Sequence, residues 1–317
     1  MTGLVADVGG TNTRLALVDD ARAIGPSARF ANDEFGSFGS VLRAFARQKS
    51  LPVLDGVCIA VAGPVTSETA RLTNRNWHFD KVEIAGLLPG LVPESVLLIN
   101  DLAALGYALP ALTGAQLVEI KPTTSDAEGN GQALVLGLGT GVNVCLGKST
   151  RKAHVVIEAE LGHVSLPNSV LEPLRAAIGS ESAAFPSVEE LFAGRGLSLL
   201  YQILSEGEQR AGQDILADYD AGVGGAVAET VDLMAGLLGH MARELVYMYQ
   251  PFGGIHFAGG VARGILGSAA RKLFLHRFET PGRFAEHASR VPIRLIIDDA
   301  AALTGAAQVI AEIPDVS

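Results

Sequence analysis

Two segments of this 317-residue chain share one plan, in which a short apolar run leads into a glycine turn and a second apolar run follows. The first segment covers residues 3–18 and turns at residues 9–12, and the second covers residues 133–147 and turns at residues 137–141. After the first turn, Leu15 and Leu17 alternate with other residues, as side chains do on one face of a β-strand. Each segment is therefore predicted to form a β-hairpin, and the shared plan indicates a weak internal duplication.

Strands and helices are mixed along the rest of the chain, which favours an α/β fold. Further strands are expected at residues 54–63, 95–100, 153–159, 253–258 and 291–298. Helices are expected at residues 37–49, 102–109, 170–178, 187–204, 211–220, 225–249, 261–278 and 299–313. The length is about twice that of a typical domain. We therefore expect a small α/β domain formed by residues 1–111 plus 300–317 and a large α/β domain formed by residues 112–299.

Composition and charge exclude several classes of function. The net charge is −10 and no basic run is present, which argues against nucleic acid as a partner. The longest apolar helix expected, residues 225–249, contains Glu229 and Asp232 among other charged residues, which excludes a membrane span. Cys58 and Cys145 lie in apolar runs without metal-ligand spacing, so buried, reduced thiols and a cytoplasmic location are expected. No signal peptide is readable at the N-terminus.

The glycine content, 37 residues of 317, is well above average and directs attention to the turns. In the first turn, Gly9 and Gly10 let backbone N–H groups face phosphate oxygens without an intervening Cβ, and the Thr11 hydroxyl can donate as well. Asp7, just before the glycines, would face the metal that travels with a nucleotide. An ordinary hairpin turn explains this segment about equally well when it is considered alone.

The second turn contains Gly137, Gly139, Thr140 and Gly141. A Walker A loop and a dinucleotide fingerprint both need glycine where Val142 stands, and a helix where the chain continues as a β run. Both classes of motif therefore fail, which leaves a second phosphate-binding turn or a bare hairpin.

A third glycine pair, Gly259–Gly260, closes the apolar strand before a helix. Alone it predicts only a strand-to-helix turn. Together, the three turns are consistent with a nucleotide held between two lobes, with its phosphates on the two hairpins and its base against the third turn.

Asn100 ends an expected strand and Asp101 follows it directly, at the end of a strand where sites of open α/β sheets are usually found. One possibility is that Asp101 only caps the helix that follows. The other is that Asp101 is a general base that accepts a substrate hydroxyl proton during phosphoryl transfer, while Asn100 holds a neighbouring hydroxyl.

Glu160 and His163 are separated by a glycine-containing pair and suit the recognition of vicinal sugar hydroxyls. No cysteine or second histidine lies nearby, so a zinc site is not expected. Glu189 lies near the start of a helix, where it either complements the helix dipole or contacts the sugar.

Taken in order, these motifs resemble the bacterial glucokinase family, in the sugar-kinase branch of the actin-like ATPase fold. The matching segments are VADVGGTNTRLAL at 5–17, IAVAGPV at 59–65, TNRNW at 73–77, IND at 99–101, GLGTG at 137–141, ELGH at 160–163, VEELFAGRGL at 188–197 and FAGGVA at 257–262.

The resemblance implies a two-lobed actin-like ATPase (ribonuclease H-like) fold with the active site in the cleft between the lobes. It implies ATP:D-glucose 6-phosphotransferase activity with Mg²⁺, and Asp101 as the catalytic base. It also implies sugar contacts from Asn100, Asp101, Glu160, His163 and Glu189 and a cytoplasmic homodimer. Its cofactor-binding positions are Ala6, Asp7, Val8, Gly9, Gly10, Thr11, Asn12, Gly137, Gly139, Thr140, Gly141, Gly259 and Gly260, with Asp7 facing the metal.

Three features distinguish the chain from related sequences. HVSLPNSVLEPL follows the glutamate–histidine element without the cysteines of the zinc-bearing repressor and kinase group, and no helix-turn-helix is expected before the first hairpin. Leu161 stands where the family more often has glycine. Phosphorylation of mannose, fructose or an N-acetylhexosamine, a phosphoryl donor of ADP or polyphosphate, a sugar-sensing regulator and an actin-like ATPase module remain alternatives.

Overall fold

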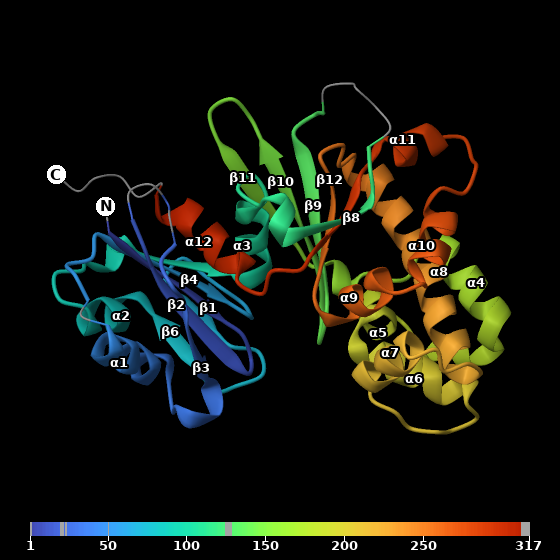
Figure 1. Ribbon diagram of the computed structural model, residues 1–317, viewed down its shortest axis with the longest axis horizontal. Coiled ribbons are helices and arrows are strands. Elements are labelled where there is room, and N and C mark those ends of the chain that lie inside the picture. Colours follow the sequence, from blue (N-terminus) through green and yellow to red (C-terminus); the bar gives the residue numbers. More distant parts are fainter. Residues whose placement is uncertain (1, 20–21, 23, 50, 124–128, 312–317) are drawn as a thin grey trace. The chain divides into compact units, whose positions relative to one another are not determined.

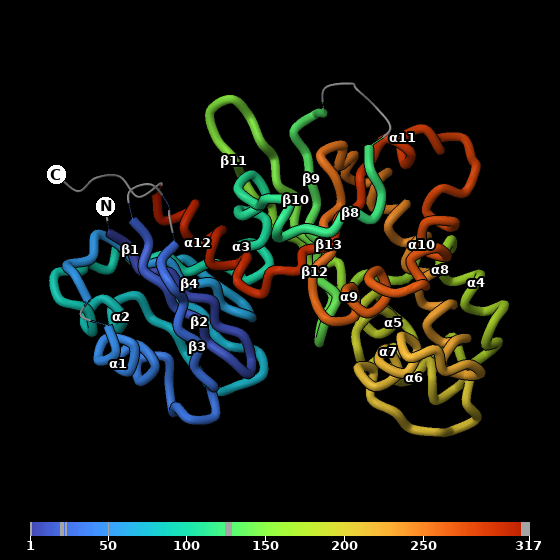
Figure 2. The backbone as a smooth tube through the Cα atoms, in the orientation of Figure 1, coloured from blue at the N-terminus to red at the C-terminus, as the bar shows by residue number. Residues whose placement is uncertain are grey.

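The computed structural model describes residues 2–19, 22, 24–49, 51–123 and 129–311. The chain forms two compact units. Unit 1 comprises Met1–Thr113 and Asp298–Ser317, and unit 2 comprises Gly114–Ile297. The chain thus returns to unit 1 at its C-terminal end, where helix α12 (Ala301–Ile310) packs beside α3 (Asp101–Ala108), as Figures 1 and 2 show.

Unit 1 is built on a five-stranded sheet of order β3-β2-β1-β4-β7. Its strands are β1 (Gly3–Val8), β2 (Asn12–Val18), β3 (Ala28–Ala31), β4 (Gly56–Val61) and β7 (Val96–Asn100). Strands β1, β4 and β7 run parallel, whereas β2 is antiparallel to both β1 and β3. A separate ribbon pairs β5 (Thr69–Arg71) with β6 (His78–Asp80).

Alternate residues of β1 enter two different cores, as the period of two in a strand requires. Leu4 and Val8 pack with α1 (Phe38–Gln48) and α2 (Lys81–Leu87) on one face of the sheet. Val5 packs on the other face against Leu303 and its neighbours in α12. The sheet is therefore covered on both faces, which explains why all six residues of β4 are buried.

Unit 2 contains a six-stranded sheet of order β11-β10-β9-β12-β13-β8. Its strands are β8 (Leu117–Lys121), β9 (Gln132–Leu138), β10 (Val142–Ser149), β11 (His154–Ala159), β12 (Gly254–Ala258) and β13 (Ile293–Ile296). Its helices are α4 (Asn168–Ile178), α5 (Val188–Phe192), α6 (Gly194–Leu204), α7 (Gly212–Asp220), α8 (Ala226–Tyr249), α9 (Gly260–Gly267), α10 (Arg271–Phe278) and α11 (Ala285–Arg290). The long helix α8 buries twelve residues, and most of them pack in the core of this unit with the neighbouring helices and the sheet.

Both predicted hairpins are confirmed, as β1–β2 and β9–β10. Two helices predicted as continuous are each divided into two shorter helices. The helix expected at residues 187–204 is interrupted at Ala193, whose backbone is extended, and becomes α5 and α6. The helix expected at 261–278 is interrupted at Ser268, which is also extended, and becomes α9 and α10.

Both cysteines are buried and neither forms a disulfide, as expected. Among the described residues, no helix combines the length and the apolar character that crossing a membrane requires.

Candidate functional site

The turn of the first hairpin, residues 9–12, is held by hydrogen bonds from Asn32 and Arg75. The Gly9 N–H donates to the Asn12 carbonyl at 3.0 Å and closes the turn. Three successive carbonyls of the turn each accept a hydrogen bond. The Gly9 carbonyl accepts from Asn32 Nδ2 at 2.8 Å, the Gly10 carbonyl from Arg75 Nε at 3.3 Å, and the Thr11 carbonyl from the Asn32 N–H at 2.9 Å. Three consecutive carbonyls therefore point toward Asn32 and Arg75.

This arrangement sets the direction of the amide groups. No described peptide bond is cis, and in a trans peptide the N–H points opposite to the C=O of the preceding residue. The N–H groups of Gly10 and Thr11 are consequently directed away from the Asn32 and Arg75 side chains. Successive N–H groups on one side of a turn form a concave site for anions. The turn thus has the arrangement that a phosphate-binding loop needs.

The predicted site residues did not include the two that hold the turn. Asn32 is fully buried and its Oδ1 accepts a 2.8 Å hydrogen bond from Thr13 Oγ1. Arg75 pairs with Asp33 and lies over the Trp77 ring, 5.6 Å from its centroid. Arg75 stands within the TNRNW motif, so a sequence signal was present for it, whereas nothing in the local sequence distinguishes Asn32.

Asp7 lies directly before this turn, opposite Arg14 in the β1–β2 ladder. Arg14 places Nη1 3.4 Å from Asp7 Oδ2 and Nη2 3.6 Å from Asp299 Oδ2. Burial raises the pKa of Asp7 from its ordinary 3.8 to about 6, although the Arg14 charge and hydrogen bond oppose that rise. Because Arg14 only partly offsets the desolvation, Asp7 is poised to gain from a further cation.

Asn100 and Asp101 occupy the junction of β7 and α3. Asn100 caps α3, because its Oδ1 accepts hydrogen bonds from the N–H groups of Leu102 and Ala103 at 2.9 and 3.4 Å. Its Nδ2 donates to the Gly63 carbonyl at 3.2 Å. Asp101 is the first residue of this helix and Asn100 is its N-cap, while Asp101 Oδ1 also accepts a 3.0 Å hydrogen bond from the Leu102 N–H.

The turn after β1 and the Asn100–Asp101 pair lie at the same edge of the sheet in unit 1. Strands β1, β4 and β7 are adjacent and parallel, so their carboxyl ends meet at one edge. Ligands of open α/β sheets bind at this edge. Unit 1 therefore gathers the proposed phosphate turn and the proposed base.

In unit 2, the turn between β9 and β10 is held to the start of α6. The Gly139 N–H donates to the Gly141 carbonyl at 3.0 Å, and the Gly194 N–H donates to the Gly139 carbonyl at 2.9 Å. Arg195 Nη1 donates to the Thr140 carbonyl at 3.2 Å. Gly137 lies just before this turn in β9.

The third turn is adjacent to the second, because Ala258 of β12 pairs with Gly137 of β9. Gly259 has φ +95° and a Cβ there would stand 2.2 Å from the Leu138 carbonyl oxygen, so only glycine fits. At Gly139 and Gly260, by contrast, a Cβ would meet no described atom within 4 Å. The protein's own packing does not require glycine at these two positions.

The predicted sugar residues Glu160 and His163 follow β11, at the same sheet edge as these turns. Asn143 Nδ2 donates to Glu160 Oε2 at 3.0 Å, and the Leu161 N–H donates to Asn143 Oδ1 at 3.0 Å. A Cβ at Gly162 would stand 2.4 Å from the Val142 carbonyl oxygen, so glycine is required there. Asn143, which was not predicted, positions Glu160.

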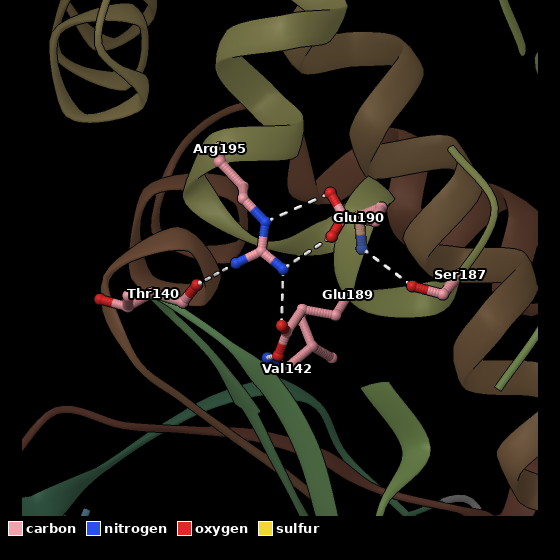
Figure 3. A network of polar contacts seen from close by, with 6 residues as sticks. All are labelled: Thr140, Val142, Ser187, Glu189, Glu190 and Arg195. Atoms are coloured by element: carbon pink, nitrogen blue, oxygen red, sulfur yellow. Dashed lines mark hydrogen bonds and ion pairs between the residues drawn. The ribbon is translucent and has the colours of Figure 1, made fainter. Parts of the chain in front are cut away.

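Glu189 is bound through both of its oxygens (Figure 3). Oε2 accepts from the Val142 N–H at 2.9 Å, and Oε1 accepts from Arg195 Nη2 at 2.6 Å. Burial acts to raise the pKa of Glu189, but the hydrogen bonds from Arg195 and Val142 and the charges of Arg195 and His163 outweigh it and hold that pKa below its ordinary value. Glu189 is thus a hydrogen-bond acceptor beside the second turn, held by the Val142 N–H and by Arg195.

Each unit therefore collects a part of the predicted set. Unit 1 contains the first turn, Asp7 and the Asn100–Asp101 pair, and unit 2 contains the other two turns with Glu160, His163 and Glu189. Arg195 lies in the VEELFAGRGL motif, but its contact with Thr140 crosses 55 positions and has no local sequence signal.

Comparisons with known proteins match nearly the whole chain. The glucokinase family model matches residues 4–313. The glucokinase of Erwinia tasmaniensis is 32% identical over 95% of this chain and 94% of that protein. The crystal structure of glucokinase from an Antarctic psychrotroph is 29% identical, with a TM-score of 0.81 and 98% of both chains covered.

A more distant structure, a ROK family glucokinase from Streptomyces griseus in complex with glucose and AMPPNP, is 18% identical with a TM-score of 0.64, and 98% of this chain and 99% of that chain are covered. These likenesses establish the two-lobed actin-like ATPase fold of sugar kinases. The matches to the family model and to the curated relatives span nearly the whole chain, which therefore belongs to the glucokinase family.

Proposed function

We propose that this protein transfers the γ-phosphoryl group of ATP to the 6-hydroxyl of D-glucose. In this reaction a bond forms between O6 of the sugar and the γ-phosphorus, the bond from that phosphorus to the β,γ-bridging oxygen breaks, and ADP leaves. Membership of the glucokinase family supports the reaction class. The Streptomyces griseus relative that holds glucose and AMPPNP supports both substrates.

The observation that carries the proposal is the common sheet edge of unit 1, where the first glycine turn and Asp101 both emerge. A phosphate-binding turn and a carboxylate base have to lie near one another for phosphoryl transfer to a hydroxyl. Asp101 would accept the proton of the 6-hydroxyl as the new bond forms. The N–H groups of Gly10 and Thr11 would hold phosphate oxygens and stabilise the charge that develops on them.

The sugar would be recognised through hydrogen bonds between its hydroxyls and the predicted sugar residues. The side-chain Oδ1 of Asn100 caps the helix, and one N–H of its Nδ2 amide donates to the Gly63 carbonyl. The second N–H of that amide can then donate to a sugar hydroxyl. Glu160 and Glu189 would accept hydrogen bonds from sugar hydroxyls, since each carboxylate oxygen retains a lone pair beyond its present contact. His163 would serve as donor or acceptor.

The nucleotide is proposed to bring Mg²⁺ with it, with Asp7 as the protein group facing the ion. The described residues contain no cluster of three or more metal-ligating side chains. One carboxylate nevertheless suits Mg²⁺, which usually keeps several waters and binds through substrate phosphates. When bound, the ion would neutralise charge on the β- and γ-phosphates. A cytoplasmic homodimer, implied by the family resemblance, remains part of the proposal.

A panel of sugars and donors tests this function. We expect glucose with ATP to give the highest kcat/KM, and mannose, fructose and N-acetylglucosamine to be slower, with ADP and polyphosphate inactive as donors. A higher kcat/KM for another hexose would reassign the substrate. ATP hydrolysis without dependence on sugar would favour an ATPase module, and glucose binding without turnover would favour a sugar sensor.

A further inference from the structure

Arg195 contacts three different groups at the start of α6 (Figure 3). Its Nη1 donates to the Thr140 carbonyl at 3.2 Å, within the second glycine turn. Its Nη2 donates to Glu189 Oε1 at 2.6 Å and to Glu190 Oε1 at 3.0 Å, and its Nε donates to Glu190 Oε2 at 3.3 Å. The Arg195 guanidinium therefore connects the second glycine turn, proposed to bind the nucleotide, with Glu189, proposed to bind the sugar.

Glu189 is tied to the same turn from its other oxygen. Oε2 accepts from the Val142 N–H, and a Cβ at Gly141 would stand only 2.7 Å from that oxygen. The turn, the carboxylate and Arg195 thus form a closed ring of contacts. A movement of the turn would change the position of Glu189, and a movement of Glu189 would change the turn.

The contacts of Arg195 add too little to the stability of the fold for stability alone to explain them. The Arg195 side chain is 48% exposed, and exposed ion pairs contribute between zero and about 1 kcal/mol to stability. The geometry is nevertheless specific, because a planar guanidinium offers donors in several fixed directions and a lysine ammonium does not reproduce them.

We propose that Arg195 is a positioning residue that couples sugar binding to nucleotide binding by holding Glu189 and the turn at Thr140 in one arrangement. The inference rests on the proposed function, in which Glu189 contacts glucose and the turn contacts the nucleotide. Each ligand favours the same arrangement, so each strengthens the binding of the other by the same factor, as thermodynamic linkage requires.

The test measures the dissociation constant of glucose by calorimetry, with and without a saturating non-hydrolysable ATP analogue, and the reciprocal experiment for the analogue. The variants are Arg195→Met, which keeps the aliphatic stem, and Arg195→Lys, which keeps the charge. Arg271→Met, an exposed arginine on α10 outside the network, is the matched control. Thermal unfolding of every variant identifies any loss of fold.

In the wild type, the analogue should tighten glucose binding by about fivefold or more, the lower end of typical coupling. In Arg195→Met this ratio should fall to about one, while the melting temperature stays within about 2 °C, the scale of a small change in stability. Arg195→Lys should recover part of the ratio, and Arg271→Met should keep all of it. A purely structural role would lower the melting temperature and leave the ratio unchanged.

The outcomes separate the two proposals. If the wild type does not phosphorylate glucose, the proposed function fails, and the inference fails with it. If the wild type is active and Arg195→Met keeps the wild-type coupling ratio, the proposed function stands and the role of Arg195 is overturned.

Discussion

The Ala104 carbonyl oxygen and Gly305 approach each other so closely that a Cβ at position 305 would stand 1.7 Å from that oxygen. At this contact helix α12 packs closely against α3, the helix that begins with Asp101. The C-terminal end of the chain thereby helps to position the proposed catalytic base.

Gly305→Ala should therefore disturb both stability and catalysis. The added methyl group forces α12 and α3 apart, and overpacking of this kind typically costs about 1–3 kcal/mol. We expect a lower free energy of unfolding in urea and a lower kcat, because Asp101 moves with α3. Gly86→Ala in α2, where a Cβ meets no described atom within 4 Å, is the control and should leave kcat unchanged without lowering the free energy of unfolding. A destabilised Gly305→Ala variant with a normal kcat would contradict the expected displacement of α3 and Asp101.

Gly139→Ala and Gly260→Ala should weaken nucleotide binding without destabilising the fold. Both positions lie within the proposed nucleotide turns, have no positive φ, and leave open space around a Cβ among the described residues. We expect KM for ATP to rise about tenfold, which corresponds to about 1.4 kcal/mol of binding free energy. Gly267→Ala, at the far end of α9 and equally open, is the control. Unchanged KM for ATP in both variants would remove these turns from the nucleotide site.

Asp7→Asn should change how stability depends on pH. The folded protein holds the pKa of Asp7 at about 6, against an ordinary 3.8, so between these values the folded state binds more protons than the unfolded state. Stability relative to Asp7→Asn should therefore fall as pH rises from 4 to 6 and stay level above that, with a slope of at most about 1.4 kcal/mol per pH unit.

Urea unfolding without nucleotide or Mg²⁺, across this pH range, measures the difference between wild type and Asp7→Asn. Asp220→Asn, which replaces an exposed carboxylate on α7, is the control substitution. A wild type that instead gains stability over Asp7→Asn as pH rises would contradict the raised pKa.

The sequence contained enough information for the local parts of this account. The β1–β2 hairpin follows from the alternation around Leu15 and the glycines that let the chain reverse, and Asp101 was located because it directly follows an apolar strand. The split at Ala193 was not predictable, because the residues on both sides have the apolar spacing of one continuous helix. The short strands β3, β5 and β6, of three or four residues, are too brief to give a period.

The residues that hold the site in place were mostly not predictable. Asn32 reaches Gly9 across 23 positions, Arg75 reaches Gly10 across 65, and Arg195 reaches Thr140 across 55. Such contacts exist only after the sheets and helices have packed. A motif therefore identifies a turn or a carboxylate, while the side chains that orient it come from distant segments.

The most direct test of the account is the kinetics of Asp101→Asn. This substitution keeps the shape of the side chain and removes its ability to accept the proton of the 6-hydroxyl. We predict that kcat falls by about 10²-fold or more, the scale of a lost general base, while the dissociation constant of glucose stays within several-fold. Asp220→Asn should retain wild-type kcat. Near-normal turnover in Asp101→Asn would contradict the assignment of Asp101 as the base.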